Sequence, residues 1–186
     1  MSILDGMISS EAELQASFTM AGAAMQDFLA KADLNDKQRQ VLALMQEGLS
    51  LADIFDITKD HRDAILAQGI RTLQLGEPAK ARELLTGLYQ IEPLDERVIY
   101  ALAATYQVES DFSRAGKLYV QFIALDATNP EGFLRLGECF LAAQEDDEAV
   151  ECFETAIELV QKNSGDPEHA QHAAKMLDII KARRGA

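Results

Sequence analysis

The amino-acid sequence predicts an all-α protein in which pairs of helices repeat and stack as a solenoid. The main evidence is that small and bulky residues recur at intervals of 34 positions through the middle of the chain. Ala, Leu, Glu, Gln and Lys are common and proline occurs only four times, so the composition favours helices. Apolar residues make up 48% of the 186 residues, which is enough to form a buried core.

Two columns of small residues define the repeat. The first column contains Gly69, Ala103 and Gly137, and the second contains Ala81, Ala115 and Ala149. Each member of the first column precedes a member of the second by twelve residues. Two helices approach to about 8 Å only where side chains are small, so these columns mark where paired helices touch. This is the pattern of tetratricopeptide repeats, whose helix pairs stack because one pair cannot bury its apolar face alone.

Bulky residues in the same register complete three repeats, and prolines fall between the helices. The predicted helices span 61–75, 78–91, 95–109, 112–125, 130–143 and 146–161. A further helix at 167–183, with Asp166 as its N-cap, is predicted to cover the last repeat. The predicted fold is therefore three tetratricopeptide repeats in a right-handed superhelical solenoid, with N-terminal helices and a C-terminal capping helix.

The chain divides into a predicted N-terminal helical segment at 1–57, the repeats at 58–162 and the capping helix at 163–186. An apolar stripe at 11–32 predicts an amphipathic helix, followed by a helix at about 36–47 that ends at Gly48 and turns Val41, Leu42 and Met45 inward. The stripe residues Leu14, Phe18, Met25 and Phe28 are candidates for homodimer contacts. The same segment could instead cap the repeats or stay partly disordered, and we expect the first ten residues to be mobile.

The formal net charge of −14 narrows the choice of partner. A protein with this negative charge repels the phosphates of nucleic acids and anionic membrane surfaces, so neither nucleic-acid binding nor stable membrane association is expected. Basic residues gather at 181–184, where their positive charge interacts favourably with the negative C-terminal end of the helix dipole. Cys139 and Cys152 lack metal-binding spacing and are predicted to be reduced and buried. Without an apolar run of membrane-spanning length or a recognisable signal peptide, the sequence predicts a cytoplasmic protein.

In a stacked solenoid, the first helix of each pair lines the concave surface. The residues of these helices that the core columns leave free are therefore predicted to line a groove. They are Asp63, Leu66, Ile70, Leu73, Arg97, Tyr100, Ala104, Gln107, Val108, Glu131, Leu134, Glu138 and Leu141. Contiguous exposed apolar surface usually binds a partner, so we expect an extended or helical peptide with apolar anchors there. The alternative is that the N-terminal segment or tighter packing buries these residues.

Motifs of catalysis and metal binding are missing from the sequence. His169 and His172 lie three residues apart on a predicted helix, but no third ligand accompanies them, and we interpret them as a surface pair. The acidic run at 145–148 lacks the spacing and the glycine of a Ca²⁺ loop. Phosphate-binding glycine loops and the GxSxG nucleophile motif are absent as well. The sequence therefore predicts a binding protein rather than an enzyme, with no metal and no cofactor.

Three stretches of the chain resemble the class II chaperones of bacterial type III secretion. EGLSLADIFDI at 47–57 is similar to that family's Gly-x-[Ser/Thr]-Leu element. LQLGEPAKARELL at 73–85 keeps the register of the family, and LGECFLAAQEDDEAVECFETA at 136–156 is similar to its third repeat. Together with the spacing from Gly48 to Gly76, three repeats and one trailing helix, the resemblance covers about 28–183.

The resemblance implies a bacterial cytoplasmic protein that binds hydrophobic translocator proteins before their export. It implies a groove that holds a short extended segment of the translocator and keeps its apolar parts from aggregating or entering the inner membrane. The positions that match the family's pocket are Leu66, Ile70, Leu73, Tyr100 and Ala104. The family often has tyrosines at the first of these positions, whereas this chain has leucines. Dimerisation through the N-terminal region is also implied.

A second hypothesis is a generic tetratricopeptide scaffold that joins soluble proteins of a complex. The two hypotheses differ in the partner that fills the groove. A chaperone would keep an otherwise insoluble, membrane-active protein in solution, whereas a scaffold would bind a partner that is soluble on its own.

Overall fold

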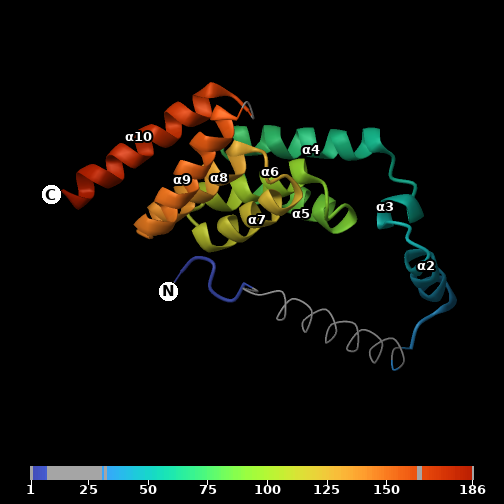
Figure 1. The fold of residues 1–186 in the computed structure, drawn as a ribbon. Coiled ribbons are helices and arrows are strands. Elements are labelled where there is room, and N and C mark those ends of the chain that lie inside the picture. The colour runs from blue at the N-terminus through green and yellow to red at the C-terminus, as the bar shows by residue number, and fades with distance from the viewer. Residues whose placement is uncertain (1, 8–30, 32, 163–164, 186) are drawn as a thin grey trace. The chain divides into compact units, whose positions relative to one another are not determined.

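The computed structural model describes residues 2–7, 31, 33–162 and 165–185, and all regular secondary structure among them is helical (Figure 1). The all-α fold predicted from the sequence is therefore confirmed. The chain forms two compact units. The repeat unit contains Met1–Leu4 and Thr58–Ala186, and the N-terminal unit contains Asp5–Ile57.

The repeat unit consists of three antiparallel helix pairs and a final helix. The pairs are α4 (Lys59–Gln74) with α5 (Pro78–Ile91), α6 (Glu96–Val108) with α7 (Phe112–Leu125), and α8 (Pro130–Ala142) with α9 (Asp146–Gln161). They are followed by α10 (Pro167–Arg184). Each pair packs against the next in chain order, as Figure 1 shows for the green to orange helices. The observed bounds differ from the predicted ones by at most two residues. The right-handed superhelical twist stays a prediction.

The turn inside each pair repeats with the same backbone geometry. Gly76, Ser110 and Gln144 lie 34 residues apart, and their φ angles are 79°, 63° and 65°. In each turn this residue donates its N–H to a carbonyl of the preceding helix, and so does the residue after it, for example Gly76 to Leu73 at 2.9 Å. Such a turn satisfies the free carbonyls at the end of the first helix. Only the glycine was apparent from the sequence, because serine and glutamine seldom adopt a positive φ.

The columns of small residues form the contacts between paired helices. Ala81, Ala115 and Ala149 are fully buried. A methyl group added at Gly69 would lie 2.8 Å from Leu85 Cδ2, and one added at Gly137 would lie 2.7 Å from Phe153 Cε1. Because such distances are well below van der Waals contact, only glycine fits at these two positions.

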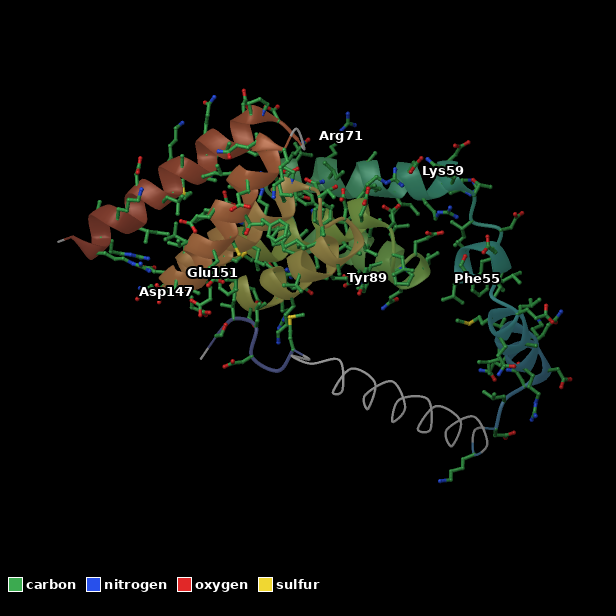
Figure 2. All side chains as sticks on the ribbon, in the orientation of Figure 1. Phe55, Lys59, Arg71, Tyr89, Asp147 and Glu151 are labelled. Atoms are coloured by element: carbon green, nitrogen blue, oxygen red, sulfur yellow. The ribbon has the colours of Figure 1, made fainter. Side chains whose placement is uncertain are left out.

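Helix α10 covers the last repeat by packing along α9 and across α8. Its side chains Ala173 and Ile180 are buried. At its C-terminal end, Arg183 bonds to Asp146, and Arg184 Nη2 lies 2.5 Å from Asp147 Oδ1. Figure 2 shows Asp147 at the start of α9, beside the end of α10. Arg183 and Arg184 therefore bind the acidic start of α9, and their positive charge is also favourable at the C-terminal end of α10.

The N-terminal unit contains α2 (Asp36–Gln46) and α3 (Leu51–Ile54). Asn35 caps α2, and Gly48, at a φ of 95°, ends it as predicted. The expectation that Val41, Leu42 and Met45 turn inward is wrong for Met45, which is 44% exposed, whereas Val41 and Leu42 are half-buried. Phe55, which follows α3, is 62% exposed.

The predicted dimer residues Leu14, Phe18, Met25 and Phe28 lie outside the described residues. Among the first ten residues, which we expect to be mobile, Ser2 and Ile3 are hydrogen-bonded to Glu145 of the repeat unit. Across the parts of the chain that the structure describes, no helix combines the length and apolar character that crossing a membrane requires.

Cys139 and Cys152 are both free thiols, and the prediction that both are buried is confirmed only for Cys139. Cys139 on α8 is buried and Cys152 on α9 is half-buried. Burial raises the pKa of both thiols to about 12. At neutral pH the two side chains are therefore uncharged and serve as small apolar packing groups.

The same glycine-to-alanine change should have opposite effects at two positions. Gly137→Ala places a methyl group 2.7 Å from the buried ring of Phe153, so it should lower the free energy of unfolding by about 1–3 kcal/mol. Gly87→Ala adds the methyl group where no described atom lies within 4 Å, and should raise that free energy by about 0.5–1 kcal/mol. Urea unfolding followed by circular dichroism measures both. Two changes of the same sign would contradict the helix contacts assigned to Gly137.

Candidate functional site

The first helices of the three pairs, α4, α6 and α8, present residues in rows whose members lie 34 positions apart. Three rows contain the predicted groove residues Leu66, Tyr100 and Leu134; Ile70, Ala104 and Glu138; and Leu73, Gln107 and Leu141. A fourth row contains Asp63, Arg97 and Glu131. Because the three helices have the same role in their pairs, each row crosses the same face of the repeat unit.

An open hollow of about 470 Å³ lies on this face. We call it the central hollow. It is lined by Leu66, Ile70, Leu73, Gln74, Glu96, Arg97, Tyr100, Ala101, Ala104, Phe122, Asn129 and Glu131. Seven of the thirteen predicted groove residues are among them. The structure therefore brings the predicted residues of the first two repeats together around one space, and their role in binding stays a prediction.

The floor and the wall of the central hollow differ in burial. Leu66 is only 6% exposed because it packs with Leu85 and Val98 in the core. The expectation that Leu66 is exposed in an empty groove is therefore wrong, and this side chain forms the floor. Ile70 is 39% exposed and Leu73 is half-buried, so these two present apolar surface to the opening.

Tyr100 is held in place from several sides. Its ring lies against Tyr119 and Phe122, with ring centroids 5.8 Å and 5.5 Å away. Its hydroxyl donates to Glu131 Oε1 at 2.5 Å and accepts from Arg135 Nε at 3.1 Å. Burial and the bond to Glu131 raise the pKa of Tyr100 to about 12. Tyr100 is thus a fixed wall of the hollow that stays protonated at physiological pH.

A polar network continues from Tyr100 along α8. Arg135 Nη1 lies 3.2 Å from Glu138 Oε2, and Gln107 donates to the same oxygen at 2.8 Å. Gln107 also accepts a bond from the Tyr119 hydroxyl at 2.7 Å. The charges of Arg135 and Glu138 therefore compensate one another, and each is held by neutral hydrogen-bonding groups of the neighbouring helices.

The outer rim of the hollow contains an ion-pair cluster between α4 and α6. Arg97 Nη1 lies 3.0 Å from Asp63 Oδ1, and Arg97 Nη2 lies 2.6 Å from Asp95 Oδ2. Lys59 bonds to Asp63 as well, and together with Arg97 it holds the pKa of the Asp63 carboxyl below its usual range. The rim of the hollow is therefore polar here, and its arginine is already engaged by acidic neighbours.

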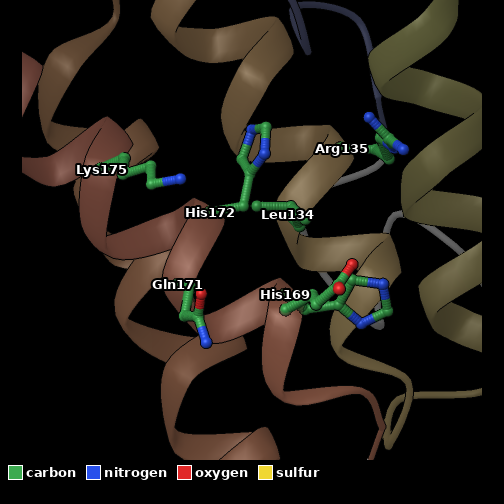
Figure 3. Close-up of a pocket in the computed structure, with 7 residues that line it drawn as sticks. Leu134, Arg135, His169, Gln171, His172 and Lys175 are labelled. Atoms are coloured by element: carbon green, nitrogen blue, oxygen red, sulfur yellow. The ribbon is translucent and has the colours of Figure 1, made fainter.

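The third repeat differs from the predicted groove because α10 crosses α8. Leu134 is 2% exposed, so its prediction as an exposed groove residue is wrong. A second, mostly polar hollow of about 450 Å³ lies between the two helices. Figure 3 shows Leu134 and Arg135 from α8 facing His169, His172 and Lys175 from α10.

The remaining predicted residues lie at the edges of this arrangement. Val108 is 63% exposed, and Leu141 is half-buried against the core. His172 is not part of a free surface pair, since its Nε2 lies 2.9 Å from Glu138 Oε1. Sequence reasoning missed Arg135, although its spacing from Glu131 and Glu138 is that of neighbours on one helix face. It also missed Phe122, which the repeat pattern placed only in the core.

No family model matches the sequence. Solved structures do match the fold. A type III secretion system complex from Aeromonas hydrophila aligns with a TM-score of 0.69 and 23% identity, over 79% of this chain and 98% of the other. The translocator chaperone SycD of Yersinia enterocolitica aligns with a TM-score of 0.62 and 21% identity, over 72% of this chain and 98% of the other.

PcrH, known from Pseudomonas aeruginosa, was solved in complex with the chaperone binding region of PopD. This structure aligns with a TM-score of 0.63 and 25% identity, over 68% of this chain and 96% of the other. SycD is thus a translocator chaperone of type III secretion, PcrH was solved with the chaperone binding region of another protein, and this chain has the helical fold of both along nearly their whole length.

Removing the Tyr100 hydroxyl should cost more stability than removing the Tyr89 hydroxyl. Tyr100 bonds to two charged groups, Glu131 and Arg135, whereas Tyr89 donates to the neutral Gln121 at 2.9 Å. We expect Tyr100→Phe to lower the free energy of unfolding by about 1.5–3 kcal/mol and Tyr89→Phe by about 0.5–1 kcal/mol. Urea unfolding of both variants measures the difference. If the two changes cost the same, the network around Tyr100 contributes nothing beyond an ordinary hydrogen bond.

Proposed function

We propose that this chain is a bacterial chaperone of type III secretion that binds hydrophobic translocator proteins in the cytoplasm. One segment of the translocator would lie in the central hollow. Two structural neighbours support the proposal by what they bind: SycD was solved with a peptide of the translocator YopD, and PcrH with the chaperone binding regions of PopB and PopD.

The observation that carries the proposal is the open apolar surface of the central hollow. Ile70, Leu73 and Ala104 surround the opening, and the rings of Tyr100 and Phe122 form part of its wall. A hollow of about 470 Å³ has room for a few side chains rather than for a folded domain. An extended segment with apolar anchor residues is the ligand that suits such a surface.

The polar groups around the hollow support a role in orienting the segment. Arg97 precedes Tyr100 in the sequence and Glu131 follows it, and both residues line the opening. Their side chains are already held by Asp95 and by Tyr100. Fixed polar groups at the edge of an apolar surface give direction and selectivity, whereas the buried apolar area supplies most of the affinity.

The same proposal makes the chain a binding protein without catalytic activity, metal or cofactor. The net charge of −14 supports protein partners over nucleic acid or an anionic membrane surface. We further propose that the protein forms a homodimer through its N-terminal segment. A dimer of SycD is among the structural neighbours, which supports this part of the proposal.

Co-expression with a hydrophobic translocator of the same secretion system tests the function. We expect the translocator to be insoluble alone and soluble with the chaperone. Ile70→Glu places a carboxylate where an apolar anchor would lie, and should weaken binding by about 10–100-fold without unfolding the chain. Leu84→Glu is the matched control, because Leu84 is 38% exposed, as Ile70 is 39% exposed, but lies on α5 outside the hollow.

Isothermal titration with the purified translocator segment measures the two affinities, and circular dichroism checks the fold of each variant. If both variants weakened translocator binding equally, the segment would not bind in the central hollow. Failure to solubilise any translocator, together with binding of a partner that is soluble alone, would favour the scaffold hypothesis instead.

A further inference from the structure

We propose that the repeat unit contains a second binding site, whose ligand is the beginning of the chain itself. The site is formed by Ser113 and Gly116 of α7 and by Glu145 at the start of α9, and we call it the notch. Ser2–Leu4 occupy it. Figure 1 shows the blue start of the chain beside the repeat helices. None of the three notch residues lines the central hollow, so the inference does not depend on the proposed function.

The hydrogen bonds of Ser2–Leu4 are specific. The Ser2 hydroxyl donates to Glu145 Oε2 at 2.6 Å, and the Ile3 N–H donates to Glu145 Oε1 at 2.7 Å. The Ser113 hydroxyl donates to the Ile3 carbonyl at 2.8 Å. The N–H and the carbonyl of Ile3 are therefore both hydrogen-bonded to side chains of the repeat unit. The two bonds to Glu145 are strengthened by the negative charge of its carboxylate.

The side chain of Ile3 is part of the core. It is 8% exposed and belongs to the same buried cluster as Ala115 and Tyr119. A methyl group added at Gly116 would lie 2.9 Å from Ile3 Cδ1 and 3.5 Å from Leu4 Cδ2. The apolar contact therefore depends on the missing side chain at position 116.

Gly116 has no other evident reason to be glycine. It lies inside α7, where glycine costs about 0.5–1 kcal/mol relative to alanine. The equivalent positions of the other repeats, 34 residues before and after, hold Arg82 and Val150. The second repeat therefore differs from its neighbours at the position where Ile3 packs.

Glu145 also behaves differently from its equivalent in the second repeat. Asp111 accepts a bond from the Arg114 N–H and so caps α7, whereas Glu145, like Glu77 in the first repeat, makes no such bond to its own helix. Its two carboxylate oxygens bind Ser2 and Ile3 instead. The geometry thus assigns this side chain to the beginning of the chain rather than to its own helix.

A disulfide in the full chain tests the docking and the identity of the docked chain. Ile3→Cys with Gly116→Cys places a sulfur near the position of Ile3 Cγ1, which lies 3.6 Å from a Cβ added at Gly116. Under mild oxidation we expect a crosslink within one chain. Its yield should be at least about ten times that of the control variant, Ile3→Cys with Leu75→Cys. Leu75 is 73% exposed and lies in the first repeat. Non-reducing electrophoresis and peptide mass analysis identify the crosslink.

Each outcome decides the proposal. A crosslink within the chain supports it. A covalent dimer would show that the notch receives the beginning of a second copy, and would overturn docking within one chain. A yield no higher than that of the Leu75 control would show that the notch is empty in solution.

Hydrogen exchange gives an independent measurement that needs no new bond. Glu145→Ala removes both acceptors for Ser2 and Ile3, so the Ile3 amide should exchange about ten times faster or more. Glu148→Ala, an exposed residue in the first turn of the same helix, is the control and should leave that amide unchanged. An Ile3 amide that is unprotected already in the unmodified chain, or unaffected by Glu145→Ala, would overturn the proposal.

Discussion

The close approach of paired helices is the constraint on which the rest of the structure depends. It is possible only where the first helix has a small residue, as at Gly69, which faces Leu85, and at Gly137, which faces the ring of Phe153, and these positions fix the 34-residue register. Once the register is fixed, every first helix turns the same positions toward one face. The central hollow follows from this, because Ile70 and Ala104 occupy equivalent places on two neighbouring helices and line the same space as Tyr100.

The fold could be predicted from the sequence because its determinants are local and repeated, so that three weak signals in one register support each other. The site could be predicted only in part. Leu66, Tyr100 and Leu134 are equivalent in the repeat, yet Leu66 is packed into the core of the first two repeats and Leu134 lies beneath α10. Tyr100 remains accessible between them. The repeat pattern predicts the same exposure for all three positions. Their actual exposure differs because the non-repeating parts of the chain pack against them differently.

Contacts between distant parts of the chain were the least predictable. Arg135 was overlooked because a charged residue on a first helix looks the same whether it faces solvent or bonds to Tyr100. The notch was overlooked for a similar reason, since a glycine in α7 and a glutamate at the start of α9 are both ordinary residues. Their departure from the repeat pattern was visible in the sequence, but its meaning depended on Ile3, which lies more than 100 residues away.

The arrangement of charges explains how an acidic protein can offer an apolar binding surface. Of the three charged residues that line the central hollow, Arg97 is paired with Asp63 and Asp95, Glu131 is paired with Arg135, and Glu96 is exposed. A ligand therefore gains little from offering a counter-charge to Arg97 or Glu131, because it would have to replace a bond already made. What it gains comes from covering apolar surface, at about 25 cal/mol per Å² removed from water. Affinity should then depend on the fit of apolar anchors, and the paired charges should act chiefly against ligands that bring an unpaired charge into the hollow.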